Sequence, residues 1–244
     1  NLVGDTVRTS TFTANASTAG VTAANGGGDI QTRTSRLGLE SAKLGRLDIG
    51  YGLTGLFATV TGHSPLPGNN FIGDVAYSAQ TSSGEYASGT AAKNATSRIL
   101  TNAVRMSGVQ YTSPTVNGIQ AVVDYGSGKQ SRDVDTVNFD NYRVSNAGLT
   151  LRYTAGKLAL AATTHTYKAD LDLAGNTQTT TDFQAYSARY AVTSNLAVNA
   201  LYAKNKSKLS TTGLQNGKND VTQVGASYTM GKNQLVAQYG EGEG

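Results

Sequence analysis

The sequence predicts an all-β fold, an antiparallel up-and-down transmembrane β-barrel, and three observations support this prediction. Apolar and polar residues alternate along most of the 244 residues, and a period of two places them on opposite faces of a strand. Short turns alternate with longer polar segments along the chain. The expected strands contain about 10–12 residues, which matches the ~9–11 residues that a tilted strand needs to cross a bilayer.

The composition excludes several other classes of protein. The chain has no cysteine, which excludes a disulfide scaffold, a thiolate zinc site and a cysteine nucleophile. Low hydrophobicity together with a net charge of only +4 is not the combination that produces a disordered chain. The pI of about 9.2 raises the possibility of nucleic-acid binding. The 20 Lys and Arg residues form no run or basic face, however, so we expect no nucleic-acid partner.

Five strands are expected in the first half of the chain, at residues 5–15, 30–41, 46–56, 103–113 and 118–126. In the third strand Leu47, Ile49, Tyr51 and Leu53 alternate with Asp48, Gly50 and Gly52. Ile119, Ala121, Val123 and Tyr125 alternate in the same way in the fifth. Short turns at 42–45 and 115–118 join neighbouring strands, and no helix of ordinary length is expected.

Six further strands are expected at 143–154, 157–168, 181–192, 196–206, 219–230 and 233–240. Their apolar positions again recur at every second residue, as in Leu149, Leu151 and Tyr153 or in Tyr186, Ala188 and Tyr190. Short turns are expected at 155–157, 193–195 and 231–233. Long polar loops are expected at 127–141, 169–180 and 207–218. Short turns therefore collect at one end of the strands and long loops at the other.

The chemistry of the two faces favours a barrel in a membrane. One face is made of Leu, Val, Ala and Tyr, and the other of Gly, Ser, Thr, Gln, Asp and Arg. Transmembrane barrels present apolar residues to lipid, polar residues to the lumen, and aromatic girdles at both interfaces. The alternative is a soluble sandwich in which a second sheet covers the apolar face, since tyrosine is also a good strand former.

Several segments together resemble the general diffusion porins of Gram-negative outer membranes, particularly the β-proteobacterial type. They are residues 32–39 with 44–50, 66–78, 109–114 with Asn117-Gly118, 148–153 and 224–228. The resemblance implies a single barrel domain over residues 1–244, with residues 57–102 as a constriction loop folded into the pore. Such porins have about 16 strands. We therefore expect the chain to be partial, with the first and last strands outside it.

The resemblance also implies a function. It predicts a homotrimer in outer-membrane lipid that passes small hydrophilic solutes and inorganic anions by passive diffusion, with no enzymatic activity and no cofactor. Arg33 matches a pore-wall position of the family, whereas the opposite parity of Arg36 predicts an outward side chain at a subunit interface. Arg98 and Arg105 are the nearest candidates for the next wall arginine.

The remaining pore candidates follow from strand parity and from the infolded loop. Arg152 and Arg189 alternate with outward Leu and Tyr, which places them in the lumen. The resemblance assigns the constriction loop to residues including Leu66, Pro67, Phe71, Gly73 and Asp74. Neutral residues at 68–70 replace an expected acid. A basic wall opposite a nearly neutral loop favours anions.

No catalytic or metal-binding motif is present in the sequence. His63 and His165 have no neighbours at ligand spacing, and Asp48, Asp124 and Glu40 are scattered. We therefore expect no catalytic residue and no metal. Two alternatives to a pore remain open: a surface or secreted β-domain that binds glycans or host proteins, and an enzyme in a smaller outer-membrane barrel, which would need a Ser/His pair.

Overall fold

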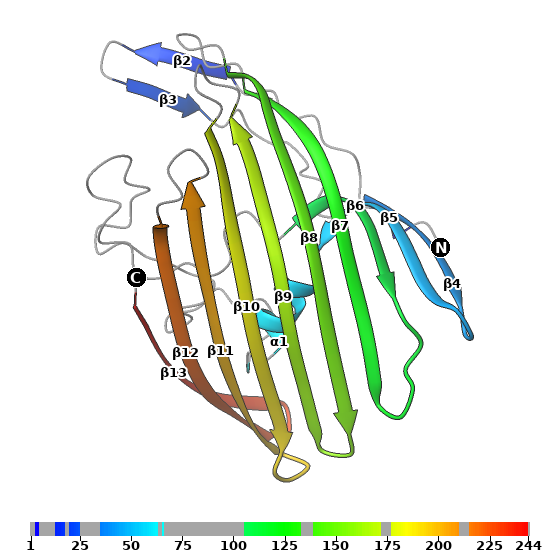
Figure 1. Cartoon of the computed structure of the whole chain (residues 1–244). Helices are drawn as coiled ribbons and strands as arrows, with labels where there is room; N and C mark the ends of the chain where they lie inside the picture. The colour runs from blue at the N-terminus through cyan, green and yellow to red at the C-terminus, as the bar shows by residue number, and fades with distance from the viewer. Residues whose placement is uncertain are drawn as a thin grey trace.

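The fold is one large antiparallel sheet. The computed structural model describes residues 3–4, 13–17, 20–24, 35–62, 65, 105–132, 139–171, 177–209 and 215–243. Within these ranges eleven strands pair in the order β1, β4, β5, β6 and onward to β13, each hydrogen-bonded to the next (Figure 1). β1 and β13 are its two edge strands. The predicted all-β, antiparallel up-and-down architecture is confirmed.

The elements that build the large sheet have the following bounds: β1 (Val3–Gly4), β4 (Ser35–Ser41), β5 (Gly45–Leu53), β6 (Arg105–Thr112), β7 (Ile119–Arg132), β8 (Phe139–Ala155), β9 (Leu158–Leu171), β10 (Thr177–Ala191), β11 (Leu196–Leu209), β12 (Gln215–Met230) and β13 (Asn233–Glu243). A separate hairpin is formed by β2 (Thr13–Ser17) and β3 (Gly20–Ala24). The prediction of one strand over 5–15 is therefore wrong at its C-terminal end, which belongs to this hairpin.

The strands from β7 to β12 are longer than predicted, with 14 residues in β7 and 17 in β8. Much of the segments predicted as long loops, at 127–141, 169–180 and 207–218, belongs to these strands. Polarity misled the prediction because backbone pairing does not require apolar side chains. Thr180 pairs in register with Lys208, for example, and Ser207 with Gly217.

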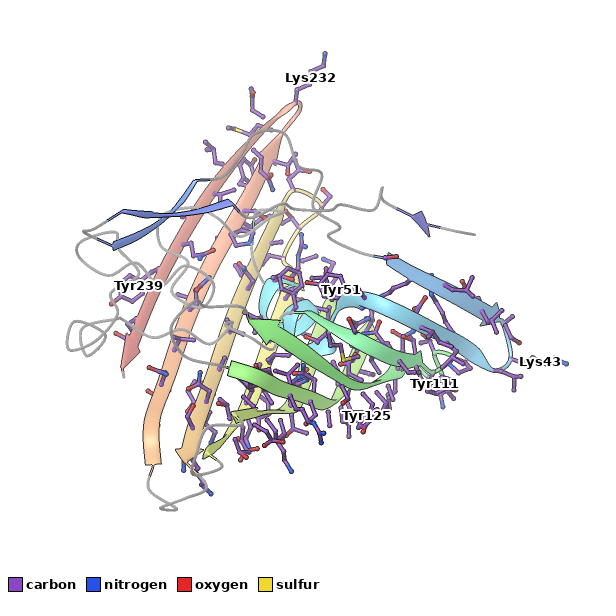
Figure 2. The ribbon with its side chains drawn as sticks, turned by 90° about the horizontal axis from the view of Figure 1, so that it is seen from above. Lys43, Tyr51, Tyr111, Tyr125, Lys232 and Tyr239 are labelled. Carbon is purple, nitrogen blue, oxygen red and sulfur yellow. The ribbon has the colours of Figure 1, made fainter. Side chains whose placement is uncertain are left out.

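The short turns that the sequence predicts are confirmed. At the turn between β6 and β7, Asn117 and Gly118 have φ values of 51° and 81°. Two consecutive residues at positive φ are typical of the tight turn that suits a twisted hairpin, and Asn-Gly is its preferred sequence. Lys43 and Lys232 mark two other turns at the same end of the strands (Figure 2).

A short helix of eight residues follows β5; the sequence analysis, which expected no helix of ordinary length, did not predict it. Helix α1 covers Gly55–Gly62 and includes two residues that were assigned to the strand at 46–56. Thr54 caps its first turn, because the Thr54 hydroxyl accepts a hydrogen bond of 3.3 Å from the amide of Phe57. The helix leads the chain away from β5 and over the concave face, where it packs against β7 to β10 (Figure 1).

The two faces of the sheet differ as the alternation predicts. The convex face carries the exposed large apolar residues, among them Leu37, Leu39, Val123, Leu151 and Tyr239. Figure 2 shows Tyr111 and Tyr125 on this side and α1 on the other. The buried polar residues, among them Asp48, Asp124, Asn146, Thr163 and Gln223, lie on the concave face. This arrangement is inverted relative to a soluble sheet and matches a barrel in lipid.

Candidate functional site

The concave face carries a continuous row of side chains across the sheet. Register pairing aligns one residue from each strand in the order Asp48, Gln110, Asp124, Gly148, His165, Phe183 and Asn205. Most of these residues are polar, and Asp48, Asp124, His165 and Asn205 are buried. We call this concave surface of the sheet the wall. Helix α1 packs on it, and the inward arginines lie on it.

Arg36 lies on this concave wall, so the prediction of an outward Arg36 is wrong. Leu37 and Leu39 are exposed on the convex face, and the period of two places the even residues of β4 on the other side. The Arg36 guanidinium donates a hydrogen bond of 2.8 Å to Gln110 Oε1 and a second one to the carbonyl of Leu53. The orientation of Arg36 was deduced from Arg33, which lies before the start of β4. Within β4 that deduction fails, and Arg36 lies on the concave face.

Glycine creates the space that Arg36 occupies. A Cβ atom added at Gly52 would collide with the Arg36 guanidinium. In the same way a Cβ at Gly148 would collide with Nδ1 of the His165 ring. His165 Nε2 lies 2.9 Å from Asn146 Oδ1, and the ring packs edge-on against Phe183 at a centroid distance of 6.3 Å. Glycines on this face thus let large side chains from the neighbouring strands lie flat on the wall.

Asp124 connects α1 to the wall. The residue is 1% exposed, and its carboxylate accepts a hydrogen bond of 2.7 Å from the amide of Gly55, the first residue of the helix. It also accepts one of 2.5 Å from the Gln110 side-chain amide. A carboxylate at a helix N-terminus satisfies a backbone donor and interacts favourably with the helix dipole. Asp124 therefore holds the start of the segment that crosses the concave face.

A chain of threonine hydroxyls provides a second attachment. Thr59 Oγ1 on α1 lies 2.6 Å from Thr163 Oγ1 on β9, which lies 2.7 Å from Thr150 Oγ1 on β8. All three side chains are buried. Because each hydroxyl can both donate and accept, the chain satisfies buried polar groups that would otherwise be costly.

An apolar cluster completes the contact between α1 and the wall. Leu56 and Val60 of the helix are fully buried, and they belong to one cluster with inward residues of β9 to β12 that include Phe183, Leu201 and Val221. Burying a leucine or a valine contributes about 1.5–3 kcal/mol. The helix is therefore fixed by apolar burial at its centre and by hydrogen bonds at its start.

The inward arginines differ in their partners. Arg46 donates to both carboxylate oxygens of Asp48, with its shortest contacts at 2.8 Å, and lies 3.8 Å from Glu40. Arg152 contacts only a neutral partner, Gln120, at 3.5 Å. Arg189 pairs in register with Asn199. Within the described part of the chain no carboxylate forms an ion pair with Arg152 or Arg189.

The wall is therefore weakly basic. Among the concave-face strand residues whose side chains the structure describes, four are arginines, Arg36, Arg46, Arg152 and Arg189, and three are acids, Glu40, Asp48 and Asp124. The difference is one positive charge. The two arginines without acidic partners lie toward the short-turn end of β8 and β10, so the positive potential is concentrated there.

Most of the remaining predicted site residues lie outside the described residues. These are Arg33, Asp74 and Arg98, together with Leu66, Pro67, Phe71 and Gly73 of the predicted constriction loop. Arg105 is the first residue of β6 and pairs with Leu53, but its side chain is not among those described. Their roles in the pore stay predictions.

Sequence analysis missed the residues that hold α1, because their partners are distant in sequence. Asp124 and His165 were noted only as scattered polar residues, and Thr150 and Thr163 were not singled out. A strand pattern indicates that these residues share a face, but it gives no sign of a helix that packs on that face. The only local sequence signal for α1 was Thr54-Gly55, because threonine is a favoured residue at the N-terminal cap of a helix.

No group of three or more His, Asp or Glu residues in the described ranges is placed to hold a metal ion. None of the described helices has both the length and the apolar character to cross a membrane.

Comparisons with known proteins agree with this geometry. A family model for Gram-negative porins matches residues 5–244. The structure is similar to the anion-selective porin from Comamonas acidovorans, with a TM-score of 0.60 and 18% identity. That match covers 87% of this chain and 57% of the porin, so the chain spans little more than half of the porin's length.

A second structure is more distant. The match to OmpT from Vibrio cholerae has a TM-score of 0.46 and 15% identity, and it covers 87% of this chain and 70% of that one. No curated protein sequence matches the chain. The likeness to the Comamonas acidovorans porin shows the fold, whereas the family model covers nearly the whole sequence. The chain therefore belongs to the Gram-negative porin family and is an outer-membrane β-barrel protein.

Proposed function

We propose that the protein forms a water-filled channel through which small hydrophilic solutes and ions diffuse passively, with a preference for anions. The observation that carries this proposal is the pairing of a polar concave face with an apolar, exposed convex face. A barrel with this polarity has a hydrated lumen. Its residues act through electrostatics and size, without a catalytic step or a cofactor.

The charges of the wall support the anion preference. Arg152 and Arg189 face the lumen without acidic partners among the described residues, and charged rings of arginine or lysine select for anions. The similar porin from Comamonas acidovorans is itself described as anion-selective, although 18% identity is too low to transfer selectivity. The proposal therefore rests on the charges of this chain.

We also propose that residues 1–244 form part of one barrel domain and that the segment entering the lumen begins at α1. Helix α1 starts at Gly55, two residues before the predicted boundary of 57–102. Its attachment to the concave wall through Asp124 and Leu56 supports a constriction formed by the segment that follows. A homotrimer in the outer membrane remains the expected assembly, and chemical cross-linking of the detergent-solubilised protein tests it.

The anion preference is tested by removing one inward charge and one outward charge from the same strand. Arg152→Gln changes the concave face of β8, whereas Arg143→Gln changes an exposed residue on its convex face. The reversal potential of the full-length protein is measured in a planar bilayer under a KCl gradient.

Arg152→Gln should lower the chloride-to-potassium permeability ratio by a factor of about two to five, because a charge a few ångströms from the ion path contributes about 1 kcal/mol in water and less with salt screening. Arg143→Gln should leave the ratio unchanged. Equal shifts in both variants would contradict the assignment of Arg152 to the lumen, and absence of any conductance would contradict the channel itself.

A further inference from the structure

The point where the chain leaves the sheet is held by side chains from three other strands. It lies at Thr54, between Leu53, the last residue of β5, and Gly55, the first residue of α1. Thr54 is buried, and the wall contacts the chain on both sides of it. The Leu53 carbonyl accepts hydrogen bonds from wall side chains, and the Gly55 amide donates one. We call these three residues the junction.

Arg36 reaches the junction from β4. Its guanidinium donates one hydrogen bond to the Leu53 carbonyl through Nη2 and another, of 2.8 Å, to Gln110 Oε1 through Nη1. Because β5 lies between β4 and β6 (Figure 1), the side chain passes over β5 to reach Gln110. Gly52 leaves room for this path, since a Cβ atom there would collide with the guanidinium. Arginine suits the position because its planar fork directs two donors at once.

Gln110 links this arginine to the anchor of α1. The Gln110 side-chain nitrogen donates a hydrogen bond of 3.1 Å to the Leu53 carbonyl and one of 2.5 Å to Asp124 Oδ1. The other carboxylate oxygen of Asp124 accepts the hydrogen bond of 2.7 Å from the Gly55 amide. With the two bonds from Arg36, these contacts form a closed triangle at the Leu53 carbonyl, and Asp124 extends the network to α1. Hydrogen bonds that share partners in this way strengthen one another.

The direct partners of Arg36 are neutral groups. Among the described residues no carboxylate forms an ion pair with Arg36, whereas Arg46 on β5 pairs with Asp48. A lysine at position 36 would keep the positive charge but would replace the fork with a single ammonium group. The geometric role of Arg36 and the role of its charge can therefore be separated by experiment.

We propose that Arg36 and Gln110 are positioning residues that fix the direction in which the chain leaves β5 and enters the lumen. They hold the Leu53 carbonyl on the β5 side of the junction, while Asp124 holds the amide on the helix side. This inference rests on the proposed channel function, in which the segment that begins at α1 narrows the pore. The width and steadiness of the pore then depend on the fork of Arg36, separately from the effect of its charge on passing ions.

The test compares two charge-conserving variants of the full-length protein. Arg36→Lys removes the fork at the junction. Arg152→Lys is the matched control, since Arg152 is also an inward arginine but contacts Gln120, at 3.5 Å, rather than the junction. Hydrogen exchange detected by mass spectrometry follows the amides of α1 in detergent. Single-channel recording in planar bilayers follows the conductance, the open-channel current noise and the reversal potential.

The amides at the start of α1 should exchange about tenfold faster in Arg36→Lys than in the parent protein, the factor expected for the loss of one hydrogen bond from a charged group. The current noise should rise and the conductance should change, while the reversal potential should stay the same because the charge is kept. Arg152→Lys should leave all of these quantities unchanged. Gln110→Met should act as Arg36→Lys does, and the double variant should exchange no faster than the faster single variant, because both residues belong to one network.

Two results would overturn the proposal. Exchange at the start of α1 could be the same in Arg36→Lys as in Arg152→Lys, or Arg36→Lys could shift the reversal potential and leave exchange and noise unchanged. The heat-induced shift in electrophoretic mobility verifies that each variant is folded, and Gln110→Met carries the same comparison if Arg36→Lys does not fold. Absence of conductance in the parent protein would contradict the proposed function alone, because hydrogen exchange still decides whether the two residues hold the junction.

Discussion

Replacing Asp124 with alanine removes the carboxylate that connects α1 to β7. In the native structure this carboxylate accepts hydrogen bonds of 2.7 Å from the Gly55 amide and 2.5 Å from Gln110. The substitution leaves the Gly55 amide without this acceptor, at a helix N-terminus where no intrahelical acceptor exists. We therefore expect the start of α1 to detach from the wall more often.

The size of the effect follows from these two bonds. Hydrogen bonds to charged groups contribute about 1.5–3 kcal/mol each. If only the bond to Gly55 acts on the helix, the docked state of α1 loses about 2 kcal/mol, and its equilibrium with the detached state shifts about 30-fold. The apolar contacts of Leu56 and Val60 remain, so the helix should fluctuate without leaving the wall permanently.

Single-channel recording in planar bilayers measures this change. Because α1 lies on the concave face, which we propose lines the lumen, its motion should raise the open-channel current noise of Asp124→Ala. Asp48→Ala is the matched control, since Asp48 is also a buried inward acid but accepts its hydrogen bonds from Arg46 rather than from the helix. Asp124→Asn keeps one oxygen acceptor and should have an intermediate effect.

The comparison between the two alanine variants decides the question. Greater noise in Asp124→Ala than in Asp48→Ala supports the attachment of α1 through Asp124. Equal current noise in both variants would mean that the loss of any inward negative charge is enough to raise the noise, whether or not the carboxylate contacts α1. Unchanged noise in Asp124→Ala would refute the reasoning, because the helix would then be held without this carboxylate.

Two further predictions concern the two faces of the sheet. Gly52→Ala should displace Arg36, because the added Cβ would collide with its guanidinium. The shift in reversal potential should match that of Arg36→Gln, whereas Gly62→Ala, whose Cβ meets nothing within 4 Å, should cause none. Leu151→Arg places a charge in lipid and should lower the unfolding free energy by about 2–4 kcal/mol in urea titrations in vesicles. Ser187→Arg on the lumen side should cost far less, and equal losses would contradict the assignment of the faces.

The strand faces could be predicted from the sequence because the period of two is a local property. The alternation of Leu149 and Leu151 with Thr150 and Arg152 already separates the residues of the two faces, and the structure places these two sets on the convex and the concave face. Parity is transferred reliably only within one continuous strand. Arg36 was misplaced because its orientation was deduced from Arg33, which lies outside β4.

The interior of the site could not be predicted because it depends on contacts between distant segments. The hydroxyl chain joins Thr59 to Thr163, which are 104 residues apart. The apolar residues Phe183, Leu201 and Val221 lie on a face that the lumen model expects to be polar. They form one buried cluster with Leu56 and Val60 of α1, and nothing local to β10, β11 or β12 indicates that cluster.

The central claim is that the concave face lines a water-filled pore while the convex face contacts lipid. Ser187 and Ala188 are consecutive in β10 and face opposite sides, and the chain contains no cysteine. Ser187→Cys and Ala188→Cys are therefore exposed in turn to a negatively charged, membrane-impermeant thiosulfonate during single-channel recording of the full-length protein. The account predicts a stepwise fall in anion current for Ser187→Cys and none for Ala188→Cys. The reverse pattern, or the same response in both, would contradict it.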